Sequence, residues 1–585
     1  MDKDDLKWSY FGKTNVSVMK KIFKSILFWI IVVSILPLIS LLIPGLPWTH
    51  DGPNHVVRIA NFYQSLSEGN IVPRWAGNLN WGYGHPILMF LYPLPSYVGS
   101  FFHFVGFTFV DSTKIVFGLS FVFSILAMYL WIRDAWGKHA AIIASLLYGF
   151  APYRFVDLYV RGAIGEHVAF IFPTLICYFL FKLATKYKRF TVYDLRLTNI
   201  YGIGASLSLA GLILSHNAMS LMFMPIIGLY ILYLYYYETK RSFSFFLFSF
   251  SFVLLGFAMS AFFWMPALLE GKYTLRDILL KGEVNKRFVS WTSFIYSPWN
   301  YGEGYQFSKE IGLIHWAVIG SFIFIIRLIR RSEKILGLSL VILFLFTLFL
   351  MTNISEPIWN SISLMQNFQF PWRLLSIAVF IPSILGAIVI HTLERYKKIH
   401  LHLTPIILLL SLVIVLRTFP MWKPKSFIIE REEYYSGIFD STTDTGESSP
   451  IWSTRFMEHR PTELASIIKG KGTLLPSKRN TTLREYTVNA QEPIRIAENT
   501  LYFPGWKVFI DGKETQIEYQ DPEYRGIMTF VVPIGEHIIA IRFGDTKLRV
   551  IANVISVFSF GMLLTWSVFS YVAIRRIKNS NTKDS

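Results

Sequence analysis

The sequence is poor in two kinds of residue on which soluble and secreted proteins depend. Only 16% of its 585 residues are charged, against about 25% in soluble domains. It has a single cysteine, Cys177, inside an apolar run, so it forms no intrachain disulfide and offers no thiol for catalysis. Hydrophobic residues make up 53% and the mean hydropathy is +0.43, which indicates an integral membrane protein.

Several catalytic signatures are also absent from the chain. There is no Walker A motif, no HExxH zinc motif, no CxxC pair and no GxSxG nucleophile elbow. The WGYG at residues 81–84 has the composition of a turn and not of a nucleotide-binding loop. These absences argue against the nucleotide, zinc and serine chemistry that such motifs carry. The remaining candidates are polar residues near the membrane.

Apolar runs of spanning length recur along the chain, and we expect about twelve transmembrane helices. The basic N-terminus and the lack of a small-residue cleavage motif predict a signal anchor for the first. A further apolar run, residues 86–107, is rich in proline and tyrosine, which favours a helix at the membrane interface. The predicted spans are residues 23–44, 114–132, 138–152, 168–184, 198–214, 218–237, 243–265, 310–327, 336–352, 372–391, 403–418 and 550–573.

With residues 86–107 outside the membrane, every short basic cluster falls on one side, which the positive-inside rule identifies as cytoplasmic. Both termini are then cytoplasmic. The net charge of +18 is explained without a nucleic-acid partner. The clusters are Lys20, Lys21 and Lys24; Arg133 and Lys138; Lys182, Lys186, Lys188 and Arg189; Lys240 and Arg241; Arg327, Arg330 and Arg331; Arg395, Lys397 and Lys398; and Arg575, Arg576 and Lys578.

The same topology places five segments on the outer side: a first loop at residues 45–113, a second at 161–167, and the segments 270–310, 353–371 and 419–550. We divide the chain into a transmembrane module (1–420), an extracytoplasmic β-rich domain (421–549) and a final helix with a basic cytoplasmic tail (550–585). WKVFI, the turn Asp511-Gly512 and QIEY predict a hairpin. TFVVP and HIIAIRF, separated by a glycine-containing turn, predict a second.

The polar residues best suited to take part in a reaction lie in the first loop, in PWTHDGPNHVVRIANFYQSLSEGNIVPRW (47–75). Asp51 is either a helix cap, with Pro53 in the first turn, or a general base or metal ligand. His55 is either a structural hydrogen-bonding residue or catalytic. Arg58 and Arg74 suit an anionic phosphate, or extend toward lipid headgroups. Asp51, His55 and Arg58 are spaced to share one face of a helix.

Other candidate residues lie in the remaining outer segments. Glu166 either forms a local ion pair with Arg161 or supplies a second functional carboxylate opposite Asp51. Arg373, at the start of a span, is a candidate for phosphate binding. Arg161, His167 and the pair His216 and Asn217 complete the predicted substrate-binding residues.

The order of these motifs resembles the GT-C superfamily, polytopic glycosyltransferases that use lipid-phosphate sugar donors. The shared features are an acidic first outer loop, the proline- and tyrosine-rich LYPLP, and a second acidic outer loop after two spans. The chain is more similar still to YfhO-like proteins and 6-pyruvoyl-tetrahydropterin-synthase-related membrane proteins. That likeness rests on DGPNH, VPRW with GYGHP, VRGAIGEH, LSHN, FFWMPALLE, QFPWR and LYFPGWKVFIDGK with PIGEH, and covers nearly the whole chain.

The resemblance implies a membrane glycosyltransferase that moves a sugar from a polyprenyl phosphate to an external glycan or polymer by an inverting displacement. Asp51, Glu166 and His55 are its expected catalytic residues. If a divalent cation such as Mg²⁺ or Mn²⁺ takes part, Asp51 and Glu166 are the expected ligands. A transporter or flippase of lipid-linked sugars is one alternative, although its ionisable groups usually lie near the bilayer midplane on broken helices. A non-catalytic assembly protein, whose β domain binds a partner, is the other.

Overall fold

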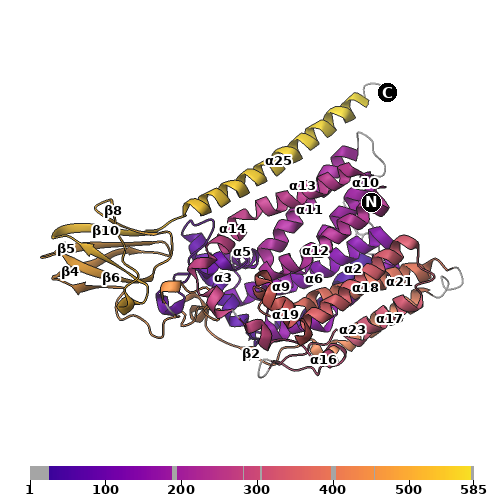
Figure 1. Cartoon of the computed structure of the whole chain (residues 1–585), viewed down its shortest axis with the longest axis horizontal. Helices are drawn as coiled ribbons and strands as arrows, with labels where there is room; N and C mark the ends of the chain where they lie inside the picture. Colours follow the sequence, from indigo (N-terminus) through magenta and orange to yellow (C-terminus); the bar gives the residue numbers. More distant parts are fainter. Residues whose placement is uncertain are drawn as a thin grey trace, which may run out of the picture.

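The fold is a bundle of long helices with a β sandwich at one end, from which the last helix returns along the side of the bundle (Figure 1). This computed structural model describes residues 25–187, 194–280, 282–302, 306–396, 403–453 and 455–581. Of the predicted cytoplasmic cluster residues, Lys20, Lys21, Lys24, Lys188, Arg189, Lys397 and Lys398 lie outside these ranges.

In the described part of the chain, seven helical segments are long and apolar enough to cross a membrane, and two bent helix pairs pass the same test. Three shorter apolar helices account for the remaining predicted spans, so each predicted span falls on a helix. The seven are α6 (Phe109–Trp136), α9 with α10 (Ile164–Ala169, Ile171–Tyr187), α12 with η4 (Asn217–Tyr233, Leu234–Glu238), α18 (Arg331–Met351), η9 with α21 (Pro371–Leu374, Leu375–Glu394), α23 with η10 (Leu403–Arg417, Phe419–Met421) and α25 (Lys547–Asn581).

The two bent pairs are α7 with α8 and the π-helical η3 (Lys138–Gly149, Pro152–Val156, Asp157–Arg161), bent by 44°, and α13 with α14 (Phe243–Met259, Ala261–Leu269), bent by 70°. The shorter helices are α2 with η1 (Ile26–Ile35, Leu36–Leu42), α11 (Asp194–Ser215) and α17 (Leu313–Phe324). Helix α21 is central, with 94% of its apolar window buried. The polytopic helical class predicted from the sequence is confirmed.

Residues 86–107 are not among the helices long and apolar enough to cross a membrane, and their place at the interface stays a prediction. They form the short helices α4 (Ile87–Phe90) and α5 (Leu94–Val105), which are separated at Pro93. Phe101 and Phe104 near the end of α5 are 59% and 76% exposed, which suits contact with lipid.

The β domain consists of two antiparallel sheets that share one core. The core takes Val488, Val508 and Ile541 from one sheet, and Ile496 and Phe530 from the other. One sheet has the order β3-β6-β9 (Ala465–Lys469, Ile494–Leu501, Ile527–Val532) and the other the order β4-β5-β10-β7-β8 (Gly472–Arg479, Leu483–Ala490, Gly535–Phe543, Trp506–Ile510, Lys513–Thr515).

One predicted hairpin is confirmed and the other is wrong. Strands β7 and β8 pair across Asp511-Gly512, both at positive φ, although the second strand begins at Lys513 and ends before QIEY. Strand β9 pairs with β6, whereas β10 pairs with β5 and β7 in the other sheet. The sandwich places the two strands in opposite sheets, so residues 533–534 carry the chain from one sheet to the other instead of forming a hairpin turn.

The first loop is built into the β domain. Helix α3 (Gly52–Ser67) and α5 lie between the sandwich and the membrane helices (Figure 1). The Trp75 ring, which is fully buried, packs edge-to-face on Trp506 at 5.4 Å in the sandwich core. Leu46–Pro47 (β1) pairs with Phe427–Ile428 (β2). The outer loops and the sandwich therefore form one packed layer over the helices.

The remaining elements are short and belong mostly to this outer layer. They are η2 (Asn80–Gly82), η5 (Gly271–Tyr273), α15 (Arg276–Leu279), η6 (Glu283–Lys286), α16 (Trp291–Ile295), η8 (Asn353–Ser355), α19 (Glu356–Ser361), α20 (Ser363–Gln366), α24 (Glu432–Ser436), η11 (Ile451–Ser453) and η12 (Pro522–Tyr524).

Replacing Trp75 by Ala tests this shared core. The cavity left between the first loop and the sandwich should lower the free energy of unfolding by about 3–5 kcal/mol. The melting temperature of the purified full-length protein in detergent measures the effect. Trp291→Ala serves as the control, because Trp291 is 46% exposed. Equal losses in the two variants would show that Trp75 does not join the layers.

Candidate functional site

Two backbone hydrogen bonds join the first loop to the second. The His50 amide donates to the Val160 carbonyl at 3.0 Å, and the Asp51 amide donates to the Arg161 carbonyl at 2.8 Å. Gly162, at φ +66°, permits this approach, because a Cβ there would lie 2.3 Å from the Thr49 hydroxyl oxygen. The two loops predicted to meet are therefore in direct contact.

Asp51 stands at the N-cap of α3, but its side chain does not cap the helix. The Thr49 hydroxyl accepts the Gly52 amide instead, at 3.1 Å. The Asp51 carboxylate is half-buried and, within the described residues, forms no hydrogen bond or ion pair. It is thus a carboxylate held in place by its backbone, with its oxygens available to a ligand.

Glu166 lies at the centre of a buried ion cluster. Arg161 binds it in bidentate fashion, with Nη1 to Oε2 at 2.9 Å and Nη2 to Oε1 at 2.8 Å. Arg373 donates from Nε to Oε1 at 3.1 Å, and the Tyr153 hydroxyl donates to Oε2 at 2.8 Å. Asp157, at the start of the π-helical turn η3, contacts Arg161 with an Oδ1 to Nη1 distance of 2.5 Å. The local ion pair expected from the sequence exists, but it is fully buried and shared with a third segment of the chain.

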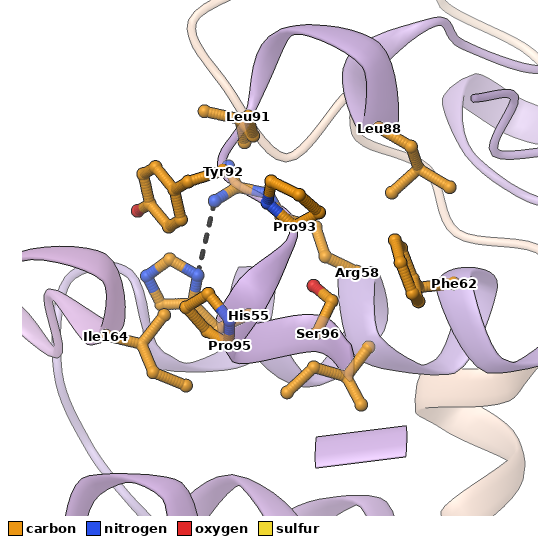
Figure 2. A pocket seen from close by; sticks show the side chains of 11 residues that line it. His55, Arg58, Phe62, Leu88, Leu91, Tyr92, Pro93, Pro95, Ser96 and Ile164 are labelled. Atoms are coloured by element: carbon orange, nitrogen blue, oxygen red, sulfur yellow. Dashed lines mark hydrogen bonds between the residues drawn. The ribbon is translucent and has the colours of Figure 1, made fainter. Parts of the chain in front are cut away.

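His55 and Arg58 line a cleft beside this cluster. The Arg58 Nη1 lies 3.3 Å from the His55 Nδ1, as the dashed line in Figure 2 shows. The Arg58 Nε and Nη2 donate to the hydroxyl and the carbonyl of Thr443. Burial, with help from Arg58 and Arg161, holds the pKa of His55 well below its usual range, so the ring is neutral at pH 7.

The cleft encloses about 370 Å³, open solvent at its mouth included. The rings of His55 and Tyr92 and the Arg58 guanidinium lie together at one end, and Phe62 and Leu88 approach from the other side (Figure 2). Burial raises the pKa of Tyr92 to about 12, so its hydroxyl stays protonated. The rest of the lining is mostly apolar: Ile59, Leu91, Pro93, Pro95, Ser96 and Ile164. The cleft is therefore polar at one end and hydrophobic along most of its wall.

His216 belongs to the site and Asn217 supports it. The His216 ring stacks on Tyr92 at 5.1 Å, and its Nε2 lies 3.8 Å from Glu166 Oε1. Its Nδ1 accepts the Met219 amide as the cap of α12. The Asn217 amide donates to the Phe90 carbonyl at 3.0 Å, which ties α12 to the segment that carries Tyr92.

The structure does not bring the other two predicted residues into the cluster. Arg74 pairs with Asp545 at 2.9 Å and donates to Asn553 at 2.8 Å, at the start of α25. His167 is fully buried and stacks on Phe121 at 5.9 Å, among apolar side chains of α6. Their roles in substrate binding remain predictions from the sequence.

Several residues at the site were not predicted. Tyr92 was noted only as part of an interfacial helix, although its place in LYPLP was a usable signal. Asp157 precedes Arg161 by four residues, a spacing typical of helical ion pairs. Thr443 gave no signal, because it contacts Arg58 across 385 residues of sequence.

Residues 88–424, more than half of the chain, match the family described as "6-pyruvoyl-tetrahydropterin synthase related domain; membrane protein". The chain belongs to this family. A member of the curated proteins, described as an uncharacterized protein of Lactococcus lactis subsp. cremoris (strain MG1363), is 24% identical over 336 residues. That match covers 55% of this chain and 50% of the relative, so the chain spans about half of the relative's length.

Among solved structures, this 6-pyruvoyl-tetrahydropterin-synthase-related chain is similar to three glycosyltransferases. They are the arabinofuranosyltransferase AftD from Mycobacteria (14% identity, TM-score 0.43, 69% of this chain and 27% of that one), ArnT from Cupriavidus metallidurans bound to undecaprenyl phosphate (11%, 0.38, 67% and 64%) and the Archaeoglobus fulgidus oligosaccharyltransferase with zinc and sulfate (14%, 0.37, 73% and 58%). All three scores lie below 0.5, so the function has to be argued from the site's own residues.

The residues of this family member do not fit a cation shared by Asp51 and Glu166. Both Glu166 oxygens already accept from Arg161, and Arg373 and Tyr153 add further donors. A metal ion would have to displace these guanidinium groups and then lie beside their charge. Across the described residues, no group of three or more His, Cys, Asp or Glu side chains is placed to hold a metal.

A pH dependence follows from His85, which is fully buried against Ser449. Burial lowers its pKa to about 3, whereas an unfolded histidine titrates near 6.5. The unfolded chain therefore binds the extra proton below pH 6.5, and stability falls as pH drops, by about 2 kcal/mol at pH 5. Melting temperatures between pH 7.5 and 5 should fall less steeply for His85→Gln than for the wild type. Identical slopes would contradict the assignment, and His459→Gln, at a position outside the outer-layer core, is the control.

Proposed function

We propose that this protein is a membrane glycosyltransferase, which moves a sugar from a polyprenyl-phosphate donor to an external glycan or polymer. One observation carries the proposal. Asp51, whose carboxylate is uncommitted within the described residues, is held by a backbone bond to Arg161, and its carbonyl accepts the amide of His55, which lines the cleft beside Arg58. A base at the N-cap of α3 and a cation about two turns later on the same helix are the groups that transfer from a lipid phosphate requires.

The cleft suits an amphipathic donor. Its apolar wall matches the first isoprenoid units, and its polar end carries Arg58. Arg58 contacts His55 and Thr443 and, within the described residues, no carboxylate, so its positive charge is not neutralised. We assign the donor phosphate to Arg58, since guanidinium groups bind phosphate oxygens with paired hydrogen bonds. Arg373, which pairs with Glu166, is the second arginine that we assign to the phosphate site.

In the proposed reaction, an acceptor hydroxyl attacks the anomeric carbon while Asp51 takes its proton. The new bond from acceptor oxygen to carbon forms as the bond from carbon to phosphate oxygen breaks, and the bonding electrons leave with the lipid phosphate. A single displacement inverts the anomeric centre. Positioning in a site that excludes water supplies most of the rate, because a phosphate is already a good leaving group.

The other predicted catalytic residues take different parts in this proposal. Glu166 holds Arg161 and Arg373 in place, because both of its oxygens are engaged. His55 is neutral, and its lowered pKa makes the ring a poor proton acceptor. In this proposal it therefore orients Arg58. No step uses a cation between Asp51 and Glu166.

A transporter of lipid-linked sugars is the second candidate, and one observation favours it. The broken span α7–α8–η3 carries Arg154 and Asp157, both fully buried among the helices. Ionisable groups on broken helices are a common feature of transport pathways. Sugar movement across vesicles without a new glycosidic bond would identify a transporter, whereas a covalent product identifies a transferase.

We also propose that the site and the β domain are extracytoplasmic. A cysteine introduced at Lys471 in the β domain should react with a membrane-impermeant maleimide applied to intact cells, whereas one at Arg241 should react only after lysis. Both positions are exposed, and the native Cys177 is buried, which keeps the background low. The reverse labelling pattern would place the site on the cytoplasmic side.

Replacing Asp51 by Asn should abolish sugar transfer while leaving expression and melting temperature unchanged. The amide keeps the shape of the side chain but cannot take a proton, and loss of a general base slows reactions by about 10²–10⁴-fold. Transfer from a radiolabelled polyprenyl-phosphate sugar to isolated cell-envelope glycan measures the effect. Asp277→Asn is the control, because Asp277 is 69% exposed and, among the described residues, pairs with Arg276 beside it. Normal transfer by the Asp51 variant would refute the assignment of the base.

A further inference from the structure

A short polar loop just before the β sandwich, residues 441–449 (STTDTGESS), bonds directly to Arg58 and is linked through Gln369 to Arg373, the two arginines of the proposed phosphate site. Thr443 accepts two hydrogen bonds from Arg58, one at its hydroxyl (2.9 Å from Arg58 Nε) and one at its carbonyl. Glu447 accepts from the Gln369 side-chain amide at 3.2 Å, and Gln369 in turn accepts from Arg373 Nη1 at 3.0 Å. The loop therefore reaches Arg58 directly, across 385 residues of sequence, and Arg373 through Gln369, which lies 78 residues before Glu447.

Thr443 is held in a backbone conformation that threonine rarely adopts. Its φ is +66°, in the left-handed region, where a β-branched side chain is strained. It is 2% exposed, and its hydroxyl also donates to the Thr442 carbonyl at 2.6 Å. A strained residue persists only where its surroundings over-determine it, and such residues concentrate at functional sites. Here the over-determining partner is Arg58.

The same arrangement recurs at Gln369. Its φ is +61°, again in the left-handed region, and its side chain bridges Arg373 and Glu447. Two strained residues, far apart in sequence, thus each orient one arginine of the same cluster. A loop that served only to connect strands would have no reason to place strained, non-glycine residues against these two guanidinium groups.

The loop itself is rigid through its own hydrogen bonds. Asp444 accepts the amides of Gly446 and Ser448, at 2.9 and 3.1 Å. Glu447 accepts the Thr445 amide at 2.8 Å. The loop can therefore hold the orientation of Thr443 without help from a ligand.

We propose that Thr443 is a positioning residue, which fixes the Arg58 guanidinium toward the cleft so that it binds the phosphate of a polyprenyl-phosphate ligand. The proposal rests on the function proposed above and deepens it, because it makes the segment that leads into the β domain part of the donor site. Preorganisation of Arg58 lowers the entropy that ligand binding would otherwise lose. The hydroxyl and the strained backbone both contribute, and the hydroxyl can be removed alone or together with the strain.

Four variants of the full-length protein separate these contributions. Thr443→Val removes the hydroxyl that accepts from Arg58, and Thr443→Ser keeps it. Thr443→Gly removes both the hydroxyl and the strain, which frees the carbonyl from its fixed direction. Thr442→Val is the matched control, because the Thr442 hydroxyl donates within the loop, to the Asp444 carbonyl at 3.2 Å.

The probe is undecaprenyl phosphate titrated into the purified protein in detergent, followed by intrinsic tryptophan fluorescence, with melting temperature measured in parallel. Affinity should fall about tenfold or more in Thr443→Val and Thr443→Gly, and stay within about threefold of wild type in Thr443→Ser and Thr442→Val. Thr443→Gly should lose affinity while melting no lower than Thr443→Val, which a purely structural role would not produce.

Two other outcomes have distinct meanings. Unchanged affinity in both Thr443→Val and Thr443→Gly, with binding by the wild type intact, would overturn the positioning role and leave the proposed function standing. Failure of the folded wild-type protein to bind undecaprenyl phosphate at all would overturn the proposed donor class, and the positioning role with it.

Discussion

The bidentate pair between Arg161 and Glu166 is the interaction on which the rest of the site depends. Both side chains are buried, so each requires the other, and loss of one partner from such a pair costs about 3–5 kcal/mol. Arg373 joins the same carboxylate from the start of α21. The pair therefore fixes the second outer loop against the central helix of the bundle, and the Arg161 carbonyl then holds the Asp51 amide.

The layer formed by the first loop and the sandwich packs over this arrangement. The first loop contributes Trp75 to the core of the sandwich, and β1 pairs with β2 just before the polar loop 441–449. Through Thr443 and Gln369, that loop reaches Arg58 and Arg373. The β domain is thus connected to the cleft by a short chain of hydrogen bonds, and its position and the direction of both arginines are linked physically.

Features that depend on local sequence were predictable, whereas features that depend on distant pairing were not. Each predicted span falls on a helix, because length and hydropathy are properties of a continuous segment. The turn at Asp511-Gly512 was predictable for the same reason, since those two residues accept positive φ. The pairing of β9 was wrong, because its partner is chosen by the sandwich as a whole and not by the adjacent strand.

The residues of the candidate site show the same difference between local and distant features. Asp51, His55 and Arg58 were found from their spacing on one helical face, and Glu166 with Arg161 from their proximity in sequence. Arg74 resembled a free arginine at the end of a loop, but its partner Asn553 lies 479 residues later. His167 follows Glu166 directly and yet points among the aromatic rings of α6, because successive residues of a helix face different directions. Thr443 needed the folded chain to be recognised at all.

The central claim is that Asp51 and Arg58 face one ligand in one cleft. An experimental structure of the full-length protein with a non-hydrolysable polyprenyl-phosphonate sugar tests it most directly. The account predicts that the phosphonate lies against the Arg58 guanidinium, with the anomeric carbon turned toward the Asp51 carboxylate and the lipid along the wall formed by Phe62 and Leu88. A phosphonate bound elsewhere in the protein, with Arg58 contacting only His55 and Thr443, would contradict it.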